Sequence, residues 1–228
     1  MYEPAPSSDV AAPSRVHTRR VVDRYRDYAE LATHETEGVD YRRLRRVPQR
    51  TTAAHIAIHG GMFEPPTSQL ADHAAATGEW AYYAFEAIKP GGNEDMHITS
   101  VRFDEPQGSE LAASVERIVA WHGTIEPGVR TFVGGRDTVL ADRIAHELRS
   151  AGFAVATHVP RHLAGTNPRN IANRNRRGRG VQLEITEGQR RRFFAGANLE
   201  RSTIESPENR TAEFYAYTAA VNRALHAV

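Results

Sequence analysis

Two histidines and two carboxylates stand at or just beyond the ends of apolar segments in this sequence. His59 ends one alternating segment, and Glu64 follows five residues later, near the expected start of a helix. His122 ends a second such segment and Glu184 a third. Two histidines and one carboxylate are the ligands of an open, hydrolytic zinc site. A further carboxylate supplies the general base that such hydrolysis needs.

The spacing also indicates how three of these residues could meet. Gly60 and Gly61 form a tight turn after His59, which would let Glu64 return to the same ion. His122 would arrive from a neighbouring strand, because ligands in open α/β sheets bind beyond the carboxyl ends of the strands. Each residue also has a simpler interpretation. His59 could be a hydrogen-bonded turn residue, and Glu64 could complement a helix dipole.

The other histidines are weaker candidates. His97, in the polar segment Met96–Ser100, could orient a substrate or a ligand, or could be an ordinary buried histidine. His55 shares a strand with His59 but lies about 13 Å away by strand rise, so we do not expect it to be a ligand. The remaining candidates are expected to be structural, surface or supporting groups: His73, His146, His158 and His162.

Length and composition favour one globular domain. The chain has 228 residues, a net charge of +1 and no cysteine, so any metal must be bound by His, Asp or Glu. Residues 1–18 are rich in Pro, Ser and Ala and are expected to form a disordered tail before a domain over 19–228. We find no apolar stretch of about 20 residues and no signal-peptide pattern. We therefore expect a cytoplasmic protein without membrane association, which cell lysis could release.

Arginine dominates the basic residues, since Lys89 is the sole lysine. Six arginines fall within one polar segment that is expected to be a loop: Arg161, Arg169, Arg174, Arg176, Arg177 and Arg179. The planar guanidinium group suits carboxylate and phosphate ligands, so this segment indicates an anionic partner. A merely solvated loop is the alternative. Nucleic acid is disfavoured, because residues 161–180 contain no aromatic side chain on which bases could stack.

Hydrophobic periodicity predicts alternating strands and helices. The expected strands are 41–47, 54–59, 80–88, 96–100, 117–122, 131–133, 153–159 and 181–185. The expected helices are 18–33, 65–77, 108–115, 137–150, 187–194 and 207–228. This order predicts a three-layer α/β domain, with a mixed central sheet and helices on both faces.

Six short motifs together resemble the phage-type poly-γ-glutamate hydrolases, a family related in fold to the zinc carboxypeptidases. The resemblance runs from about Tyr25 to Arg192. The motifs are His59-Gly-Gly-x-x-Glu64-Pro-x-Thr67, His97-Ile-Thr-Ser100, His122-Gly123, Gly134-Gly135, Asn170-Ile-x-Asn173-Arg174 and Gly180-Val-Gln-Leu-Glu184.

The resemblance implies a carboxypeptidase-like fold and one Zn²⁺ ion held by His59, Glu64 and His122. It further implies Glu184 as the general base in the hydrolysis of γ-glutamyl amide bonds in a polyanionic polymer. We expect Arg174, with Asn170 or Asn173, to bind a substrate carboxylate or the developing oxyanion.

The first histidine and the glutamate are separated by four residues, rather than the two usual in carboxypeptidases. The arginines that hold a terminal carboxylate in carboxypeptidases have no obvious counterpart by spacing, which leaves endo-cleavage open. We expect a monomer. Another zinc amidase, acting on peptidoglycan peptides or N-acyl amino acids, is the main alternative, and a binder of anionic polymers is a remote one.

Overall fold

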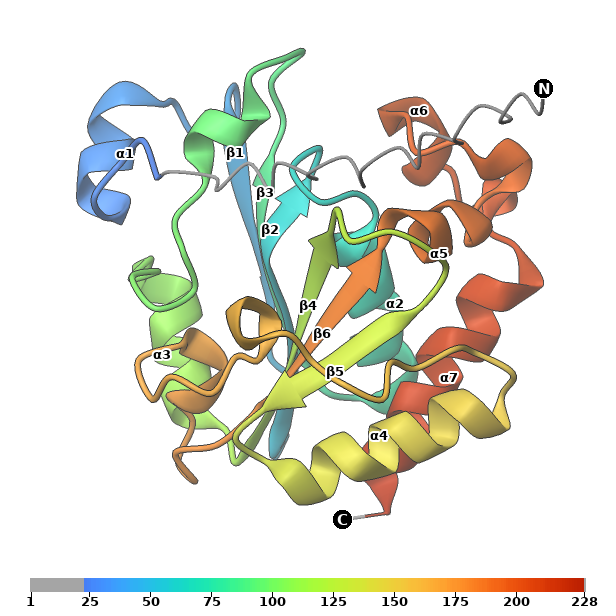
Figure 1. Cartoon of the computed structure of the whole chain (residues 1–228). Helices are drawn as coiled ribbons and strands as arrows, with labels where there is room; N and C mark the ends of the chain where they lie inside the picture. The colour runs from blue at the N-terminus through green and yellow to red at the C-terminus, as the bar shows by residue number, and fades with distance from the viewer. Residues whose placement is uncertain (1–22, 228) are drawn as a thin grey trace, which may run out of the picture.

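The centre of the molecule is a six-stranded mixed sheet with the order β1-β3-β2-β4-β6-β5 (Figure 1). The computed structural model describes residues 23–227. The strands are β1 (Tyr41–Arg46), β2 (Ala53–Gly61), β3 (Ala81–Ala87), β4 (Arg117–Thr124), β5 (Thr131–Gly135) and β6 (Val181–Thr186). The four inner strands run parallel, whereas β1 and β5 pair antiparallel at the two edges. The predicted mixed α/β sheet is confirmed.

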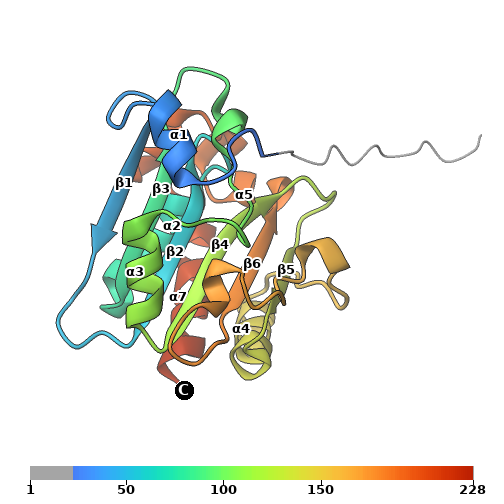
Figure 2. The ribbon, with the colours of Figure 1, turned by 90° about the vertical axis from the view of Figure 1, so that its left-hand side faces the viewer.

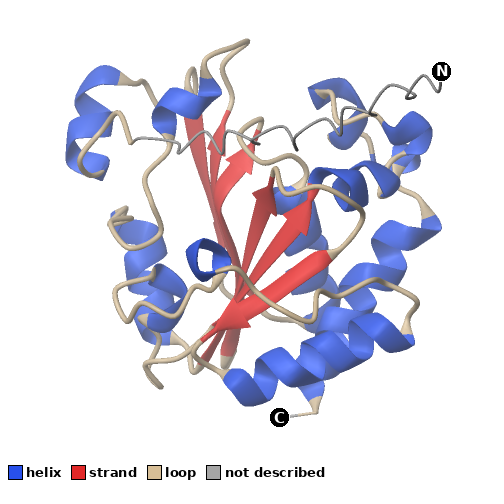
Figure 3. Cartoon of the chain, in the orientation of Figure 1, coloured by secondary structure: helices blue, strands red, loops and turns tan. Residues whose placement is uncertain are grey.

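Helices cover both faces of this sheet (Figures 1 and 3). The helices are α1 (Tyr28–His34), α2 (Thr67–Gly78), α3 (Pro106–Ser114), α4 (Thr138–Ser150), α5 (Glu187–Arg192), α6 (Arg201–Ile204) and α7 (Ala212–His226). One face carries α2, α4 and α7, and the opposite face carries α3, with α1 toward the end of the sheet at which the parallel strands finish (Figure 2). The sheet therefore forms the middle of three layers, as the sequence predicted.

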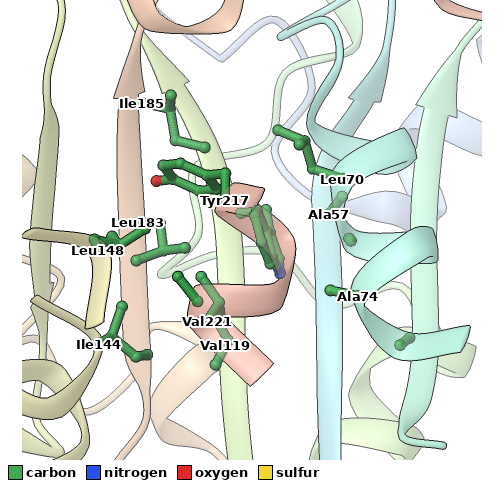
Figure 4. Close-up of a cluster of buried hydrophobic side chains, with 14 of the residues drawn as sticks. Ala57, Leu70, Ala74, Val119, Ile144, Leu148, Leu183, Ile185, Tyr217 and Val221 are labelled. Carbon is green, nitrogen blue, oxygen red and sulfur yellow. The ribbon is translucent and has the colours of Figure 1, made fainter. Parts of the chain in front are cut away.

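The larger hydrophobic core lies between the sheet and helices α2, α4 and α7. Trp121 and Leu183 from the sheet pack in one buried cluster with Leu70, Ile144 and Tyr217 from the helices (Figure 4). Burying one side chain of this size contributes about 1.5–3 kcal/mol. The second core, on the α3 face, contains Ile56 and Ile118, which alternate along their strands with the residues of the first core.

Because β2, β4 and β6 run parallel, they bring their candidate site residues to the same end of the sheet. His59, His122 and Glu184 all fall in the carboxyl-terminal halves of these strands. Parallel strands bring their carboxyl ends to the same end of a sheet. In β4 and β6 the two side chains are direct partners, because His122 is in register with Glu184.

The predicted strand over 96–100 is wrong. A short 3₁₀ helix, η1 (Asn93–Met96), precedes His97, and the following residues are irregular. The edge of β3 that such a strand would join is already paired with β1. The polar segment instead takes its hydrogen bonds from elsewhere: the carboxylate of Asp23 accepts from the backbone N–H of Thr99, and Ser100 O accepts from Ile171.

The predicted strand over 153–159 is also wrong. It is reduced to a single bridge between Thr131 and Val155 beside the edge strand β5. The bridge consists of two backbone hydrogen bonds: the N–H of Thr131 donates to Ala154 O, and the N–H of Ala156 donates to Thr131 O. The chain then leaves the sheet at once, so an apolar run that looks like a strand serves to cover the sheet edge.

Two helix boundaries differ from expectation. The first helix begins at Tyr28, where Asp27 caps it by accepting a hydrogen bond from the backbone of Glu30; residues 23–27 of the expected helix are not helical, and residues 18–22 lie outside the described residues. The last helix begins at Ala212, after a separate 3₁₀ turn over Pro207–Asn209. The expected tail over 1–18 lies outside the described residues. Within residues 23–227, no helix is long and apolar enough to cross a bilayer.

Candidate metal centre

An irregularity near the end of β2 directs His59 toward the α3 face of the sheet. The pairing of β2 with β3 shifts between Ala57 and Gly60, which breaks the alternation of side chains. Ile58 packs in the core on the α3 face. The ring of His59 lies toward that same face, with its Nε2 3.0 Å from the carbonyl oxygen of Ile98.

The turn after His59 depends on glycine. Gly61 has a φ of +64°, and a Cβ there would lie 2.3 Å from the carbonyl oxygen of Ala87. Only glycine fits this close approach at low cost. The backbone N–H of Glu64 donates to the carbonyl oxygen of His59 at 3.1 Å, so the chain turns back on itself. The chain therefore brings Glu64 back to His59, as the sequence predicted.

Potential ligand atoms of three side chains converge at this end of the sheet. The Nδ1 atom of His59 lies 3.1 Å from Oε1 of Glu64 and 3.2 Å from Nδ1 of His122. The Nδ1 atom of His122 lies 3.4 Å from Oε2 of Glu64. Among the residues that the structure describes, these three form the one group whose ligand atoms are close enough to share an ion.

These separations fit a tetrahedral metal shell. Ligand atoms about 2 Å from a zinc ion are roughly 3.3 Å from one another at tetrahedral angles. The tautomer of His59 fits as well, because its Nε2 must carry the proton that faces the carbonyl of Ile98. Nδ1 of His59 is then the ring atom that faces the carboxylate of Glu64 and His122, where a cation could contact all three side chains.

The carboxylate of Glu64 is held in place from the side of β4. Its Oε2 accepts a hydrogen bond of 2.8 Å from the backbone N–H of Gly123, next to His122. Burial acts to raise the pKa of Glu64, but the adjacent His59 and His122 together outweigh it and keep the pKa below its ordinary value. The group is therefore ready to act as an anionic ligand near neutral pH.

His122 leaves one atom without a partner. Its ring is buried, and Nε2 has no hydrogen-bond partner among the described residues. Its Nδ1 faces His59 and Glu64, both of which are candidate ligands. Burial of a ring nitrogen without a partner is costly, and the Nδ1 atom is the one directed at the candidate ligands.

Glu184 lies on the same face of the sheet as His122. On β6 the alternation places Leu183 and Ile185 in the core against the helices and turns Glu184 the other way. Its Oε1 accepts a hydrogen bond of 2.6 Å from Nε2 of Gln182, two residues earlier on the strand. Burial and the nearby Glu64 carboxylate raise the pKa of Glu184 well above its ordinary value.

His97 lies against the candidate metal ligands. Its ring centroid is 4.3 Å from that of His59, and the ring also stacks on Phe63. Nδ1 lies 2.6 Å from a carboxylate oxygen of Asp23, which therefore accepts its proton. Burial and neighbouring His59 lower the pKa of His97 to about 4, so the ring is neutral at pH 7. Its other nitrogen then offers a lone pair.

Asn170 and Asn173 are buried within the loop before β6. The amide nitrogen of Asn170 donates to Oε1 of Gln182, and its oxygen accepts from the backbone of Ala172. Asn173 donates to two loop carbonyls and accepts from Gly180. Both amides thus stabilise the loop, and Asn170 is linked to Glu184 through Gln182.

Arg174 is not brought to the three ligands. Its guanidinium group donates to the backbone carbonyl of Phe103, near α3. Arg176 and Arg177 form ion pairs with Glu116 and Asp137. The first part of the loop contacts other segments. The carbonyl oxygen of Leu163 accepts a hydrogen bond from Gln182, and Nε2 of His162 lies 3.2 Å from Oε1 of Glu126, on the loop after β4.

The remaining histidines lie apart from the ligands. His55 is fully buried on the opposite face, where the indole N–H of Trp121 donates to its Nδ1 at 3.0 Å. Burial lowers the pKa of His55 to about 3. His146 and His158 are exposed.

Sequence reasoning missed two residues that support the site. Gln182 could have been found, because it precedes Glu184 by two residues and therefore shares its side of a strand. Asp23 carries no such signal. It reaches His97 and Thr99 across more than seventy residues of sequence, and only the folded chain brings them together.

Comparison with known proteins bears on the same residues. A family model described as poly-gamma-glutamate hydrolase matches residues 25–220. The UPF0714 protein YndL of Bacillus subtilis (strain 168) is 33% identical over 207 residues, covering 89% of this chain and 78% of YndL. The SPbeta prophage-derived UPF0714 protein YoqZ of the same strain is 34% identical over 210 residues, covering 90% of this chain and 72% of YoqZ.

Solved structures give the same result. A bacteriophage poly-gamma-glutamate hydrolase matches with a TM-score of 0.85 and 31% identity, over 90% of this chain and 98% of the other. A zinc-free form of YndL matches with a TM-score of 0.82 and 30% identity, over the same shares. The range of the family model, residues 25–220, includes the sheet, the turn after β2 and the loop before β6. This chain belongs to the poly-γ-glutamate hydrolase family.

Proposed function

We propose that this protein is a zinc-dependent hydrolase that cleaves γ-glutamyl amide bonds of poly-γ-glutamate. The observation that carries the proposal is the convergence of His59, Glu64 and His122, with Glu184 in register beside His122. Family membership supports the hydrolase activity and the substrate class. The zinc-free form of the similar YndL supports the choice of metal.

One Zn²⁺ ion would be held by His59, Glu64 and His122. When bound, zinc polarises an amide carbonyl and lowers the pKa of water. Its positive charge would also offset the repulsion by Glu64 that raises the pKa of Glu184. Glu184 would then be a carboxylate at working pH and could accept a proton.

In the proposed reaction Glu184 takes a proton from water as the water oxygen bonds to the amide carbon. The carbon–nitrogen bond then breaks, and Glu184 returns the proton to the leaving nitrogen. The products are a carboxylic acid and an amine, which are carboxylate and ammonium after proton exchange at neutral pH, and Glu184 regains its starting state. Gln182 would orient Glu184 through its 2.6 Å hydrogen bond.

In this proposal the substrate is recognised both by a group next to the candidate metal ligands and by groups farther away. The free ring nitrogen of His97 is suited to accept a hydrogen bond from a substrate amide N–H. Poly-γ-glutamate carries an α-carboxylate on each residue, and the exposed Arg161 would attract these charges. Arg174, Asn170 and Asn173 stay candidates for substrate binding, with Asn170 acting through Gln182.

The test is depolymerisation of poly-γ-glutamate by the purified protein, followed by size-exclusion chromatography. We expect shortening that a chelator stops and added zinc restores. His122→Ala should lose both zinc and activity, whereas His146→Ala, at an exposed histidine, should keep both. Stoichiometric zinc without shortening would move the substrate to another amide, and absence of bound metal in the wild type would refute the three-ligand site.

A further inference from the structure

Arg190 is a buried arginine that none of the roles above uses. It lies on α5, directly after β6, and is only 6% exposed. Its pKa is lowered by burial, an effect that the Glu64 carboxylate partly offsets. An arginine rarely lies so deep without a specific set of partners. Its partners here lie next to the candidate metal ligands and the proposed base.

The guanidinium group joins two segments through backbone carbonyls. Nε donates to Ile185 O at 3.1 Å, and Nη1 donates to Pro65 O. Ile185 follows the proposed base Glu184, and Pro65 follows the candidate ligand Glu64. Arg190 therefore connects the end of β6 to the turn that returns Glu64 to His59.

The same group also packs on β4. A Cβ at Gly123 would lie 2.7 Å from Cζ and 2.8 Å from Nε of Arg190, so the guanidinium lies directly against this glycine. The backbone N–H of Gly123 is the donor that holds Oε2 of Glu64 at 2.8 Å. Glu64 is held by the turn after β2 and by the backbone N–H of Gly123 in β4, and Arg190 contacts both of these segments.

We propose that Arg190 is a positioning residue of the metal centre, which fixes Glu64 relative to His59 and His122. This inference rests on the proposed zinc site. Arg190 touches neither ligand atom of the histidines, and it acts by fixing the backbone on both sides of Glu64. Loss of it would let Glu64 move, and zinc would bind more weakly because a ligand must first be ordered.

The first test measures the zinc dissociation constant by competition with a chromophoric chelator. Arg190→Met should weaken zinc binding by roughly 10–100-fold, the range seen when groups that orient ligands are lost. Arg192→Met is the matched control on the same helix, since Arg192 is exposed and paired with Glu213. Equal zinc affinity in Arg190→Met and the wild type would overturn the inference.

Arg190→Lys separates positioning from general support of the fold. Lysine keeps the charge but cannot donate to two carbonyls in the fixed planar arrangement of a guanidinium group. We expect Arg190→Lys to remain folded and still to bind zinc less tightly than the wild type. Wild-type zinc affinity in Arg190→Lys would mean that only the charge matters and would overturn positioning through hydrogen bonds.

A double-mutant cycle with Gly123 tests the contact itself. Gly123→Ala should displace the guanidinium and weaken zinc binding, because the three atoms nearest to the added Cβ all belong to Arg190. In the Arg190→Met background the same substitution should have a much smaller effect. Additive losses of zinc affinity would show that the two residues act independently, against the inference. A wild type that binds no zinc would instead remove the proposed site itself.

Discussion

Two regions of the molecule differ in how their polar side chains are paired: the metal end of the sheet (His59, Glu64, His122 and Glu184) and the arginine segment (residues 161–180). At the metal end, ligand atoms of three side chains face one another at 3.1–3.4 Å. In the arginine segment several polar groups have partners elsewhere in the fold. Arg177 pairs with Asp137, for example, and Asn173 with loop carbonyls. Ligand atoms from three side chains that gather at one point indicate a binding site, whereas polar groups that are paired one by one with neighbouring segments indicate a structural loop.

The comparison teaches how to interpret charge in a sequence. Six arginines within twenty residues suggested an anion site, yet the second half of the segment lies near the amino end of β6. Glu184 is three residues along that strand from Val181, about 10 Å away by strand rise. Only the first half, around Arg161 and Leu163, adjoins the proposed base through Gln182.

Removing a ligand should give the largest effect. His122→Ala leaves two of three ligands, and both zinc binding and depolymerisation should fall below detection, because a water-activating ion needs all three. Metal analysis and chromatography of the polymer check this result. If His122→Ala kept zinc and activity, the metal end would not be the site.

Replacing the base should separate binding from turnover. We expect Glu184→Gln to keep stoichiometric zinc and to lower the rate of depolymerisation by about 10²–10⁴-fold, the usual contribution of general acid–base catalysis. Zinc content and turnover should be measured on the same preparation. A variant with wild-type turnover would contradict the assigned role of Glu184.

The sequence alone predicted most of the metal end. Strand alternation located β2, β4 and β6, and the parallel order of these strands brought His59, His122 and Glu184 to one end. The Gly-Gly turn predicted the return of Glu64. These predictions succeeded because each depends on local periodicity or on the conformational freedom of glycine.

The features that the sequence did not predict depend on contacts between distant segments. The irregularity between Ala57 and Gly60 redirects His59, and no local pattern signals it. The segment around Thr99 looked like a strand, but Asp23 holds it outside the sheet. Arg190 likewise reaches Pro65 across the sequence. Apolar periodicity gives no information about such long-range polar partners.

Weakening the support of the base should give a smaller effect. Gln182→Leu removes the donor to Oε1 of Glu184, a loss of about 1.5 kcal/mol or roughly tenfold in turnover. That hydrogen bond lowers the pKa of Glu184. Without it the pKa rises, so the acid limb of the pH–rate profile should move to higher pH. An unchanged profile with unchanged zinc affinity would mean that Gln182 does not orient the base.

A substitution in the arginine segment should affect stability and not zinc binding. Arg177→Met leaves the buried carboxylate of Asp137 without its partner at 2.8 Å. We expect the free energy of unfolding in urea to fall by about 2 kcal/mol, with the zinc dissociation constant unchanged. Arg179→Met, at an exposed position, serves as the control. A clear loss of zinc affinity in Arg177→Met would break the division between the two regions.

The smallest effect should come from an exposed arginine in the first half of the segment. Arg161→Ser removes a charge two residues before Leu163, whose carbonyl oxygen accepts from Gln182, so the KM for long poly-γ-glutamate should rise by about 2–3-fold at low salt, and the difference should vanish at high salt. Arg179→Ser removes the same charge at the other end of the segment. Because exposed charges act over only about 10 Å at 0.1 M salt, it should have less effect. Equal changes in KM for the two variants would mean that the polymer senses only the overall charge of the protein, and that neither half of the segment lines its path.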